Sequence, residues 1–238
     1  MEQNSNNNSG KAYGLHYGWS GGHKMVAEEL PDGRRQIQMG HASGSYREAD
    51  VTFKTAPLYM AFGENGLNSV STQFQRFVSS KLKNNPASRK PRPIHFNCWE
   101  AVYFKHSLEK LKHLAQTAAE LGAERFVLDD GWFGKRNNDK TSLGDWNVDY
   151  EKYPNGLSPL IDHIKDLGLD FGIWFEPEMV NNQSELYTNH PDWILGLPDQ
   201  NLGRNQLVLD MSKSEVIDYL YNCINEILSK YEVDYVKW

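Results

Sequence analysis

The sequence predicts an antiparallel β region followed by a larger α/β region built around a parallel sheet. Up to about residue 63, short segments alternate apolar and polar residues, which is the pattern of half-buried antiparallel strands. After residue 93, strand-like runs that are apolar on both faces alternate with helical stretches, which is typical of a parallel sheet covered by helices. Between these regions, residues 85–93 are rich in proline and charge and predict a domain boundary near residue 90.

The first region contains four predicted strands and one helix. The turn signal PDGR separates the second strand from the third. Apolar residues between Leu67 and Leu82 recur at helical spacing and predict the helix. The expected strands cover residues 12–20, 24–30, 34–40 and 49–62, and the expected helix covers 66–85.

The second region alternates strands with helices. Ser107 and Gly122 are suited to begin and to end its first long helix. Either a (β/α)8 barrel or a doubly wound sheet has this order of elements. No glycine-rich phosphate-binding motif follows a strand, which disfavours a nucleotide-binding fold. The expected strands cover residues 94–99, 125–130, 170–177, 206–211 and 234–238, and the expected helices cover 107–122, 156–168 and 212–231.

The composition narrows the classes of function. The chain has 238 residues, of which 39% are hydrophobic, so it can bury a sizeable core. A net charge of −6 with interspersed acids and bases argues against a nucleic-acid partner. No run of 18 apolar residues occurs and the N-terminus is polar, so we expect no membrane partner and a cytoplasmic location. Cys98 and Cys223 lack metal-ligand spacing, which fits a reduced compartment.

Charged and ring-bearing residues follow the apolar runs at three strand ends, in FVLDDGW, GIWFEPE and YVKW. Barrel enzymes assemble their sites from the C-terminal ends of several strands. The tryptophans in CWEA, DDGWF, GDWN and IWFEPE lie within a residue or two of an acid, and rings beside carboxylates suit the recognition of sugars. The pattern favours a sugar-binding barrel, although tryptophans are also good core residues and acids at strand ends also cap helices.

Six sequence blocks resemble those of the retaining α-galactosidases, or melibiases, of glycoside hydrolase family 36. The resemblance extends from about residue 11 to the last residue and implies an N-terminal β-supersandwich followed by a catalytic (β/α)8 barrel. Residues 1–92 would then be the end of the supersandwich with a connecting helix and linker, and 93–238 the first half of the barrel. The blocks are CWEAVYF, FVLDDGWFGKR, SLGDWNVD, WFEPEMV, GRNQLVLD and DYVKW.

The resemblance implies hydrolysis of terminal α-D-galactosyl residues from melibiose- or raffinose-type oligosaccharides by a retaining double displacement. Such a mechanism needs two carboxyl groups about 5 Å apart. The family nucleophile would fall at position 239, directly after Trp238, and its acid/base aspartate further on, so we expect residues 1–238 alone to be inactive. The family needs no metal or organic cofactor, and the full-length protein is expected to form a homo-oligomer. The alternatives are a non-catalytic carbohydrate-binding or assembly fragment, a transglycosylase, or an α-N-acetylgalactosaminidase.

The resemblance also assigns substrate-binding residues. Asp129 and Asp130 would accept hydrogen bonds from the galactose hydroxyls at positions 4 and 6, where contact with the 4-hydroxyl distinguishes galactose from glucose. The alternative is an acid pair that caps the following helix or pairs with Arg136. The other residues that match family binding positions are Trp99, Trp174, Lys237, Arg204 and Trp146.

Each of these further residues has an expected role. Trp99 and Trp174 would form walls around the galactose, with core packing as the alternative. Lys237 lies two residues before the expected nucleophile, so both side chains would share one face of the strand. Arg204 would reach the site from a loop, unless it forms a surface ion pair. Trp146 would lie on a loop over the site.

Overall fold

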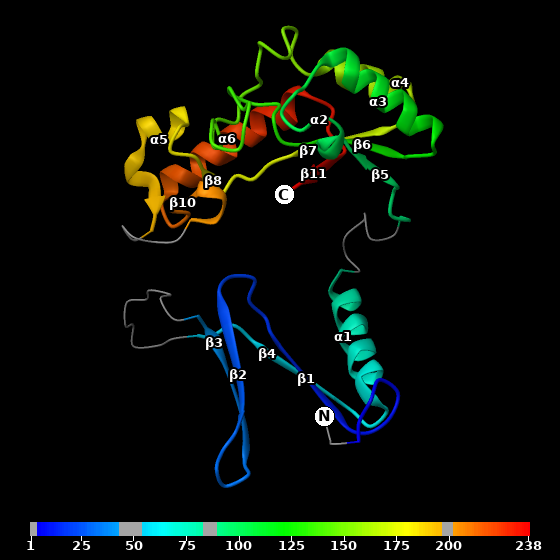
Figure 1. Ribbon diagram of the computed structural model, residues 1–238, viewed down its shortest axis with the longest axis vertical. Helices are drawn as coiled ribbons and strands as arrows, with labels where there is room; N and C mark the ends of the chain where they lie inside the picture. The colour runs from blue at the N-terminus through cyan, green and yellow to red at the C-terminus, as the bar shows by residue number, and fades with distance from the viewer. Residues whose placement is uncertain (1–3, 43–53, 83–89, 197–201) are drawn as a thin grey trace. The chain divides into compact units, whose positions relative to one another are not determined.

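The computed structural model describes residues 4–42, 54–82, 90–196 and 202–238. It divides into two compact units, Met1–Pro91 and Arg92–Trp238 (Figure 1). The predicted antiparallel and parallel sheets are both present. The first part of the predicted strand 49–62 and most of the predicted linker lie outside the described residues.

Unit 1 consists of two antiparallel strand pairs and a helix. Strand β1 (Ala12–Tyr17) pairs with β4 (Leu58–Gly63), and β2 (His23–Glu29) pairs with β3 (Arg35–His41). Helix α1 covers Gly66–Leu82, as the helical spacing predicts. The described strands of this unit therefore follow the alternation of the sequence.

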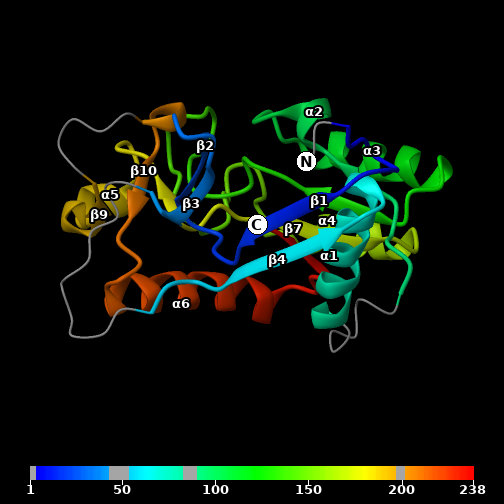
Figure 2. The ribbon, with the colours of Figure 1, turned by 90° about the horizontal axis from the view of Figure 1, so that it is seen from below.

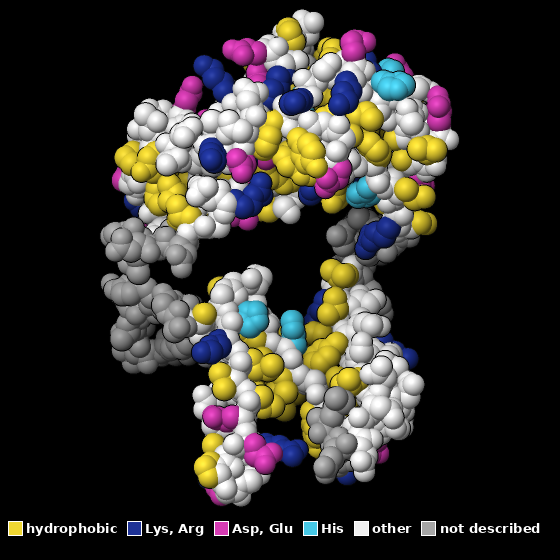
Figure 3. Space-filling view, in the orientation of Figure 1, with side chains coloured by type: hydrophobic (Ala, Val, Ile, Leu, Met, Phe, Trp, Pro, Cys, Tyr) yellow, Lys and Arg dark blue, Asp and Glu magenta, His cyan; other side chains and the backbone are white. Residues whose placement is uncertain are grey.

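The predicted PDGR turn joins β2 to β3. The amide of Gly33 donates to the carbonyl of Leu30 at 2.8 Å, and the amide of Leu30 donates to the carbonyl of Arg34 at 2.7 Å. Gly33 has φ +82°, a conformation that only glycine adopts without strain. Several large apolar side chains of unit 1 are nevertheless exposed, including Met60 and Phe62. Figure 3 shows hydrophobic side chains gathered between the β2–β3 hairpin and α1.

Unit 2 is built on a four-stranded parallel sheet with the order β11-β7-β6-β5. Its strands are β5 (His95–Asn97), β6 (Arg125–Leu128), β7 (Asp170–Trp174) and β11 (Tyr235–Lys237). Apart from their first residues, the two central strands are buried at every position, as expected for a parallel sheet covered on both faces. Because all four strands run the same way, their C-terminal ends meet at one edge of the unit.

Helices join these strands and bury one apolar stripe each. Residues Leu111, Ala115 and Ala118 form the buried stripe of α3 at helical spacing. Ser107 precedes α3 as predicted, but its side chain makes no capping hydrogen bond. Figures 1 and 2 both show α3 and α4 side by side and α6 apart from them. The helices of the unit are α2 (Trp99–Val102), α3 (Leu108–Glu120), α4 (Ser158–Asp166), α5 (Glu185–Asn189) and α6 (Ser214–Lys230), with short 3-10 turns at Pro191–Trp193 and Gly203–Asn205.

The strand expected at 206–211 does not belong to the parallel sheet, which corrects the predicted topology. It forms β10 (Leu207–Leu209), which lies in a separate antiparallel sheet between β8 (Met179–Val180) and β9 (Ile194–Leu195). The chain after β7 folds back on itself and supplies both partners of β10. An apolar run of three residues pairs with whichever edge is near, so its sequence alone does not determine its sheet.

The parallel sheet is strongly curved. In a flat four-stranded sheet the outer strands lie roughly 14 Å apart, three spacings of about 4.8 Å. Here the ring of His95 on β5 and the ring of Tyr235 on β11 have centroids 4.9 Å apart. Residues from the two outer strands therefore meet on the concave face of the sheet.

Candidate functional site

The C-terminal ends of three strands converge on Asp129. Its Oδ2 accepts hydrogen bonds from Asn97 Nδ2, at the end of β5, and from Lys237 Nζ, at the end of β11, each at 2.5 Å. Its Oδ1 accepts a bond from the amide of Asp130 at 2.9 Å. The Asp129 side chain is 6% exposed and that of Lys237 is 43% exposed. Curvature thus produces a carboxylate paired with a cation that still reaches solvent.

Asp130 points to a different partner. Arg136 donates from Nε to Oδ1 and from Nη2 to Oδ2, both at 2.9 Å. The Arg136 side chain is completely buried, and that of Asp130 is 5% exposed. Of the alternatives left by the sequence, pairing with Arg136 is therefore observed for Asp130 but not for Asp129. The two acids follow the end of β6 at Leu128, and their carboxylates bind different cations.

A buried polar layer supports the turn that follows the two acids. Gly131 has φ +110°, and a Cβ at this position would lie 3.1 Å from Nε2 of His106. His106 Nδ1 and the Tyr153 hydroxyl form a hydrogen bond of 2.7 Å, and the imidazole tautomer determines which of the two is the donor. Burial, with a contribution from the Lys152 charge, lowers the pKa of His106 to about 4. The imidazole is therefore neutral at physiological pH.

Lys152 completes the hydrogen bonds of this polar layer. Its Nζ donates to the carbonyl of Gly131 at 2.8 Å and to that of Arg136 at 2.7 Å, and it lies 3.6 Å from the carboxylate of Asp149. Burial lowers the pKa of Lys152, and the Asp149 charge opposes that shift. Lys152 thus links Gly131, which follows the two acids, to Arg136, which binds one of them.

The two predicted wall residues lie at the C-terminal ends of β7 and β5, which are separated in the sheet by β6. Trp174 is the last residue of β7 and is opposite Lys237 in the parallel register, with 9% of its surface exposed. Trp99 begins α2 directly after β5, and its amide donates to Asn97 Oδ1 at 2.8 Å. Asn97 therefore holds both Trp99 and Asp129.

Trp146, expected on a loop over the site, is 2% exposed. Its ring centroid lies 4.4 Å from that of Phe133, 5.4 Å from that of Phe175 and 5.9 Å from that of Trp174. The indole therefore packs in a cluster of rings that includes Trp174. A contact between Trp146 and a substrate stays a prediction.

Arg204 lies on an exposed loop near the end of β7. Arg204 and Asn205 have φ +52° and +55°, a left-handed conformation that is uncommon outside glycine. The next residue, Gln206, donates from Nε2 to Oε2 of Glu176 at 3.1 Å. Burial raises the pKa of Glu176, and the nearby charge of Arg204 opposes that rise. The loop is thus anchored to the C-terminal edge of the sheet.

The structure brings most of the predicted residues to this edge and adds others. Asp129 and Lys237 are in direct contact, with Trp174 beside them in the register. Sequence reasoning missed Asn97 and Glu176. A signal for Asn97 was present, because it is a polar residue at the end of an apolar strand.

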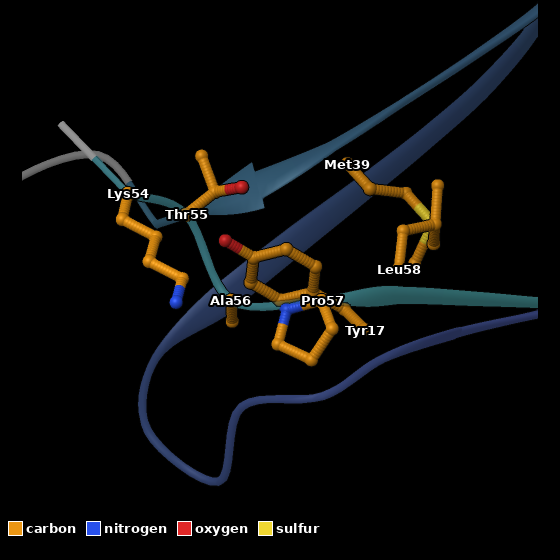
Figure 4. Close-up of a pocket in the computed structure, with 7 residues that line it drawn as sticks. All are labelled: Tyr17, Met39, Lys54, Thr55, Ala56, Pro57 and Leu58. Carbon is orange, nitrogen blue, oxygen red and sulfur yellow. The ribbon is translucent and has the colours of Figure 1, made fainter.

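Each of the two units has a cavity among the described residues. Unit 1 has one of about 550 Å³, and Figure 4 shows the side chains around it. Its lining residues are Tyr17, Met39, Lys54, Thr55, Ala56, Pro57 and Leu58. Unit 2 has an apolar groove of about 340 Å³, called the α6 groove, lined by Met211, Ile217, Leu220, Tyr221, Ile224, Asn225, Leu228 and Trp238.

Two absences apply to the described part of the chain. No group of three or more His, Cys, Asp and Glu side chains there is placed to hold a metal ion. Among the helices of that part, none combines the length and the apolar character needed to cross a membrane.

Comparison with known proteins places this edge in a family context. The model of the melibiase family matches residues 52–238, which is more than half of the chain. The chain belongs to the melibiase family. The α-galactosidase of Escherichia coli is 44% identical over 234 residues, covering 96% of this chain and 33% of the relative. The α-galactosidase AgaA of Geobacillus stearothermophilus is 41% identical over 243 residues, covering 100% of this chain and 33% of the relative.

Solved structures of melibiases agree. The GH36 α-galactosidase AgaB of Geobacillus stearothermophilus matches with a TM-score of 0.90 and 41% identity, covering 99% of this chain and 33% of that one. A variant of AgaA from the same organism, in complex with raffinose, matches with a TM-score of 0.91 and 40% identity, covering 99% of this chain and 34% of that one. The chain is therefore a glycoside hydrolase family 36 member that spans about a third of the length of these relatives.

Proposed function

We propose that this chain carries the galactose-binding half of an α-galactosidase site. Residues 93–238 would form the first half of a (β/α)8 barrel, and residues 1–92 the end of the preceding β-supersandwich with its connecting helix and linker. The curvature of the parallel sheet supports the barrel, because closing a sheet requires its outer strands to approach. The single observation that carries the proposal is the convergence of Asn97 and Lys237 on Asp129 at the C-terminal edge.

The chemistry of this edge suits a galactosyl group. An ionised carboxylate is a strong and directional acceptor for a sugar hydroxyl, and Asp129 is the acceptor nearest to the exposed lysine. Lys237 would donate to a second hydroxyl and favour the ionised form of a neighbouring carboxyl group. Trp174 and Trp99 would supply apolar walls for the C–H faces of the ring.

The reaction would be hydrolysis of terminal α-D-galactosyl groups with retention of configuration. Family 36 relatives have been crystallised with raffinose and stachyose, so α-galactoside oligosaccharides are the proposed substrates. A retaining mechanism needs a nucleophile and an acid/base. We assign neither role to a residue of this segment, and the nucleophile is expected directly after Trp238. Assembly of the whole protein into a homo-oligomer stays a prediction of the resemblance.

Two measurements test this proposal. Galactose binding to residues 1–238 is measured by two-dimensional NMR titration against glucose, with the indole signal of Trp174 as the reporter. Hydrolysis of p-nitrophenyl α-galactoside is followed in a polypeptide that continues beyond Trp238, with the configuration of the released sugar read by proton NMR. We expect preferential binding of galactose and first release of the α-anomer. Equal binding of both sugars, or first release of the β-anomer, would contradict the proposal.

A further inference from the structure

The pairing of Asp130 with Arg136 leaves the carboxylate no freedom to rotate. The terminal torsion of an aspartate is broad when the group is free. Two parallel N–H···O bonds of 2.9 Å from one guanidinium fix the plane of the carboxylate, because both groups are planar and the donors are spaced like the acceptors. Each oxygen still has a lone pair that Arg136 does not use.

Arg136 is itself held on every side. Its Nη1 donates to the carbonyl of Thr141 and to Oδ1 of Asn181, both at 2.8 Å, so four of its five N–H donors are used. The guanidinium carbon lies 5.3 Å from the ring centroid of Phe104 and 6.0 Å from that of Phe133. Asp130 therefore receives its orientation from a group that cannot move independently.

Asn181 aims this guanidinium. It is 1% exposed, and its Oδ1 also accepts from the amide of Leu143 at 3.0 Å. Its own amide donates to the carbonyl of Leu143 at 3.0 Å, which ties the segment after β8 to the loop after β6. The acceptor for Arg136 is thus fixed by two contacts with the backbone of Leu143.

Stability alone does not account for a buried ion pair at this place. Replacing such a pair by apolar residues of similar volume is often neutral or stabilising, because both charges must leave water. An apolar pair would, however, lose the directional acceptor. Recognition that distinguishes two hydroxyl arrangements requires polar groups held in one geometry.

We propose that Arg136, aimed by Asn181, is a positioning residue that fixes the carboxylate of Asp130 and thereby sets the discrimination between galactose and glucose. This inference rests on the proposed function, in which the acid pair accepts bonds from the hydroxyls at positions 4 and 6, of which the 4-hydroxyl differs in configuration between these sugars. Arg136 contacts no sugar in this scheme. Its effect reaches the ligand only through Asp130.

The test compares two arginine-to-lysine changes in residues 1–238. Arg136→Lys keeps the positive charge and removes the fork, so we expect the dissociation constant for galactose to rise about tenfold while that for glucose changes little. The matched control is Arg125→Lys, which alters an arginine-carboxylate pair at the N-terminal edge of the same sheet, with the arginine side chain 12% and the carboxylate side chain 44% exposed. We expect its ratio of galactose to glucose affinity to stay at the value of the unchanged chain.

Asn181→Ala gives a second, milder variant. It keeps Arg136 and Asp130 and removes one acceptor, so the affinity ratio should fall about threefold in the same direction. Circular dichroism and thermal melts identify variants that do not fold. An unchanged ratio in folded Arg136→Lys would overturn the inference, and if that variant does not fold, an unchanged ratio in Asn181→Ala would do so. An unaltered chain without preference for galactose would overturn the proposed function as well, which separates the two failures.

Discussion

Both edges of the parallel sheet hold a carboxylate paired with a cation, but the cation and its surroundings differ between the two edges. At the N-terminal edge, Arg125 donates to Asp170 at 2.8 Å, lies 3.1 Å from the ring nitrogen of His95 and stacks 4.8 Å over the ring of Tyr235. At the C-terminal edge, Lys237 bonds Asp129 and keeps 43% of its side chain exposed.

The difference lies in the choice of cation. A guanidinium is planar and packs against rings, and the Arg125 side chain is only 12% exposed, whereas its partner Asp170 is 44% exposed. An ammonium is a compact charge on a flexible stem, and at the C-terminal edge the cation is the more exposed partner, because Asp129 is only 6% exposed. A polar cluster therefore forms at both edges, with a buried guanidinium at one and a partly exposed ammonium at the other.

The largest expected effect that would sharpen this contrast comes from Arg136→Met. The change leaves Asp130 buried without a partner, which we expect to cost about 3–5 kcal/mol of unfolding free energy. Arg125→Met is the matched change at the other edge and should cost about 1 kcal/mol or less, because the Asp170 side chain is 44% exposed and regains water. Urea unfolding followed by near-ultraviolet circular dichroism measures both, and equal losses would contradict the contrast.

The next effect concerns ligand binding. We expect Asp129→Asn to weaken galactose binding by about 10- to 100-fold, because a hydrogen bond to a charged acceptor contributes about 1.5–3 kcal/mol. Asp170→Asn, at the N-terminal edge, should leave galactose binding unchanged. An NMR titration of the two variants decides, and a similar loss in both would show that the binding change comes from general destabilisation.

A third effect is the pH dependence that His106 gives to the C-terminal edge. Its pKa is lowered to about 4 by burial, below the ordinary value of 6.5, so the unfolded chain binds the proton more readily than the folded chain. This contribution to stability is therefore complete above pH 6.5 and falls as pH is lowered toward 4. Between pH 7 and pH 5 the loss should be about 2 kcal/mol.

His106→Gln tests that pH dependence, because glutamine keeps a hydrogen-bonding side chain but does not titrate. Unfolding free energies of the variant should vary less between pH 7 and pH 5 than those of the unchanged chain. An identical slope in both proteins would assign the pH dependence to other groups.

The smallest expected effect is at the N-terminal edge. Tyr235→Leu removes the ring under the Arg125 guanidinium and should cost about 0.5–1 kcal/mol of unfolding free energy. Galactose binding should not change, because the substitution lies at the opposite end of β11 from Lys237. A loss of galactose binding in this folded variant would contradict the contrast between the two edges of the sheet.

The residue pattern of the sequence predicted those strands and helices that are determined by their own residues. The strand ends at Asp129 and Trp174 and the helix after Ser107 follow from period, burial and turn chemistry. The membership of β10 in an antiparallel sheet could not be predicted, because its three residues pair according to the partners that the fold places nearby.

The candidate site was predictable in position but not in its contacts. Asp130 and Arg136 are six residues apart, so their pairing could be named as an alternative, and the structure shows it. Asn97 and Asp129 are 32 residues apart, and their contact requires the register of two strands. The indoles of Trp146 and Trp174 carry the same acid-and-ring signature, and the sequence alone does not reveal that their rings pack 5.9 Å apart.

Trp238 gives the chain a built-in optical probe. Its indole is 69% exposed, donates to Glu178 at 3.2 Å and forms one wall of the α6 groove, whereas Trp19 is 45% exposed and Trp132, Trp146, Trp174 and Trp193 are exposed by 9% or less. Acrylamide should therefore quench Trp238 first, and the red edge of the emission should come from Trp238 together with Trp19. Any molecule or chain segment that settles on α6 would shift that emission to the blue and slow its quenching, with no label attached.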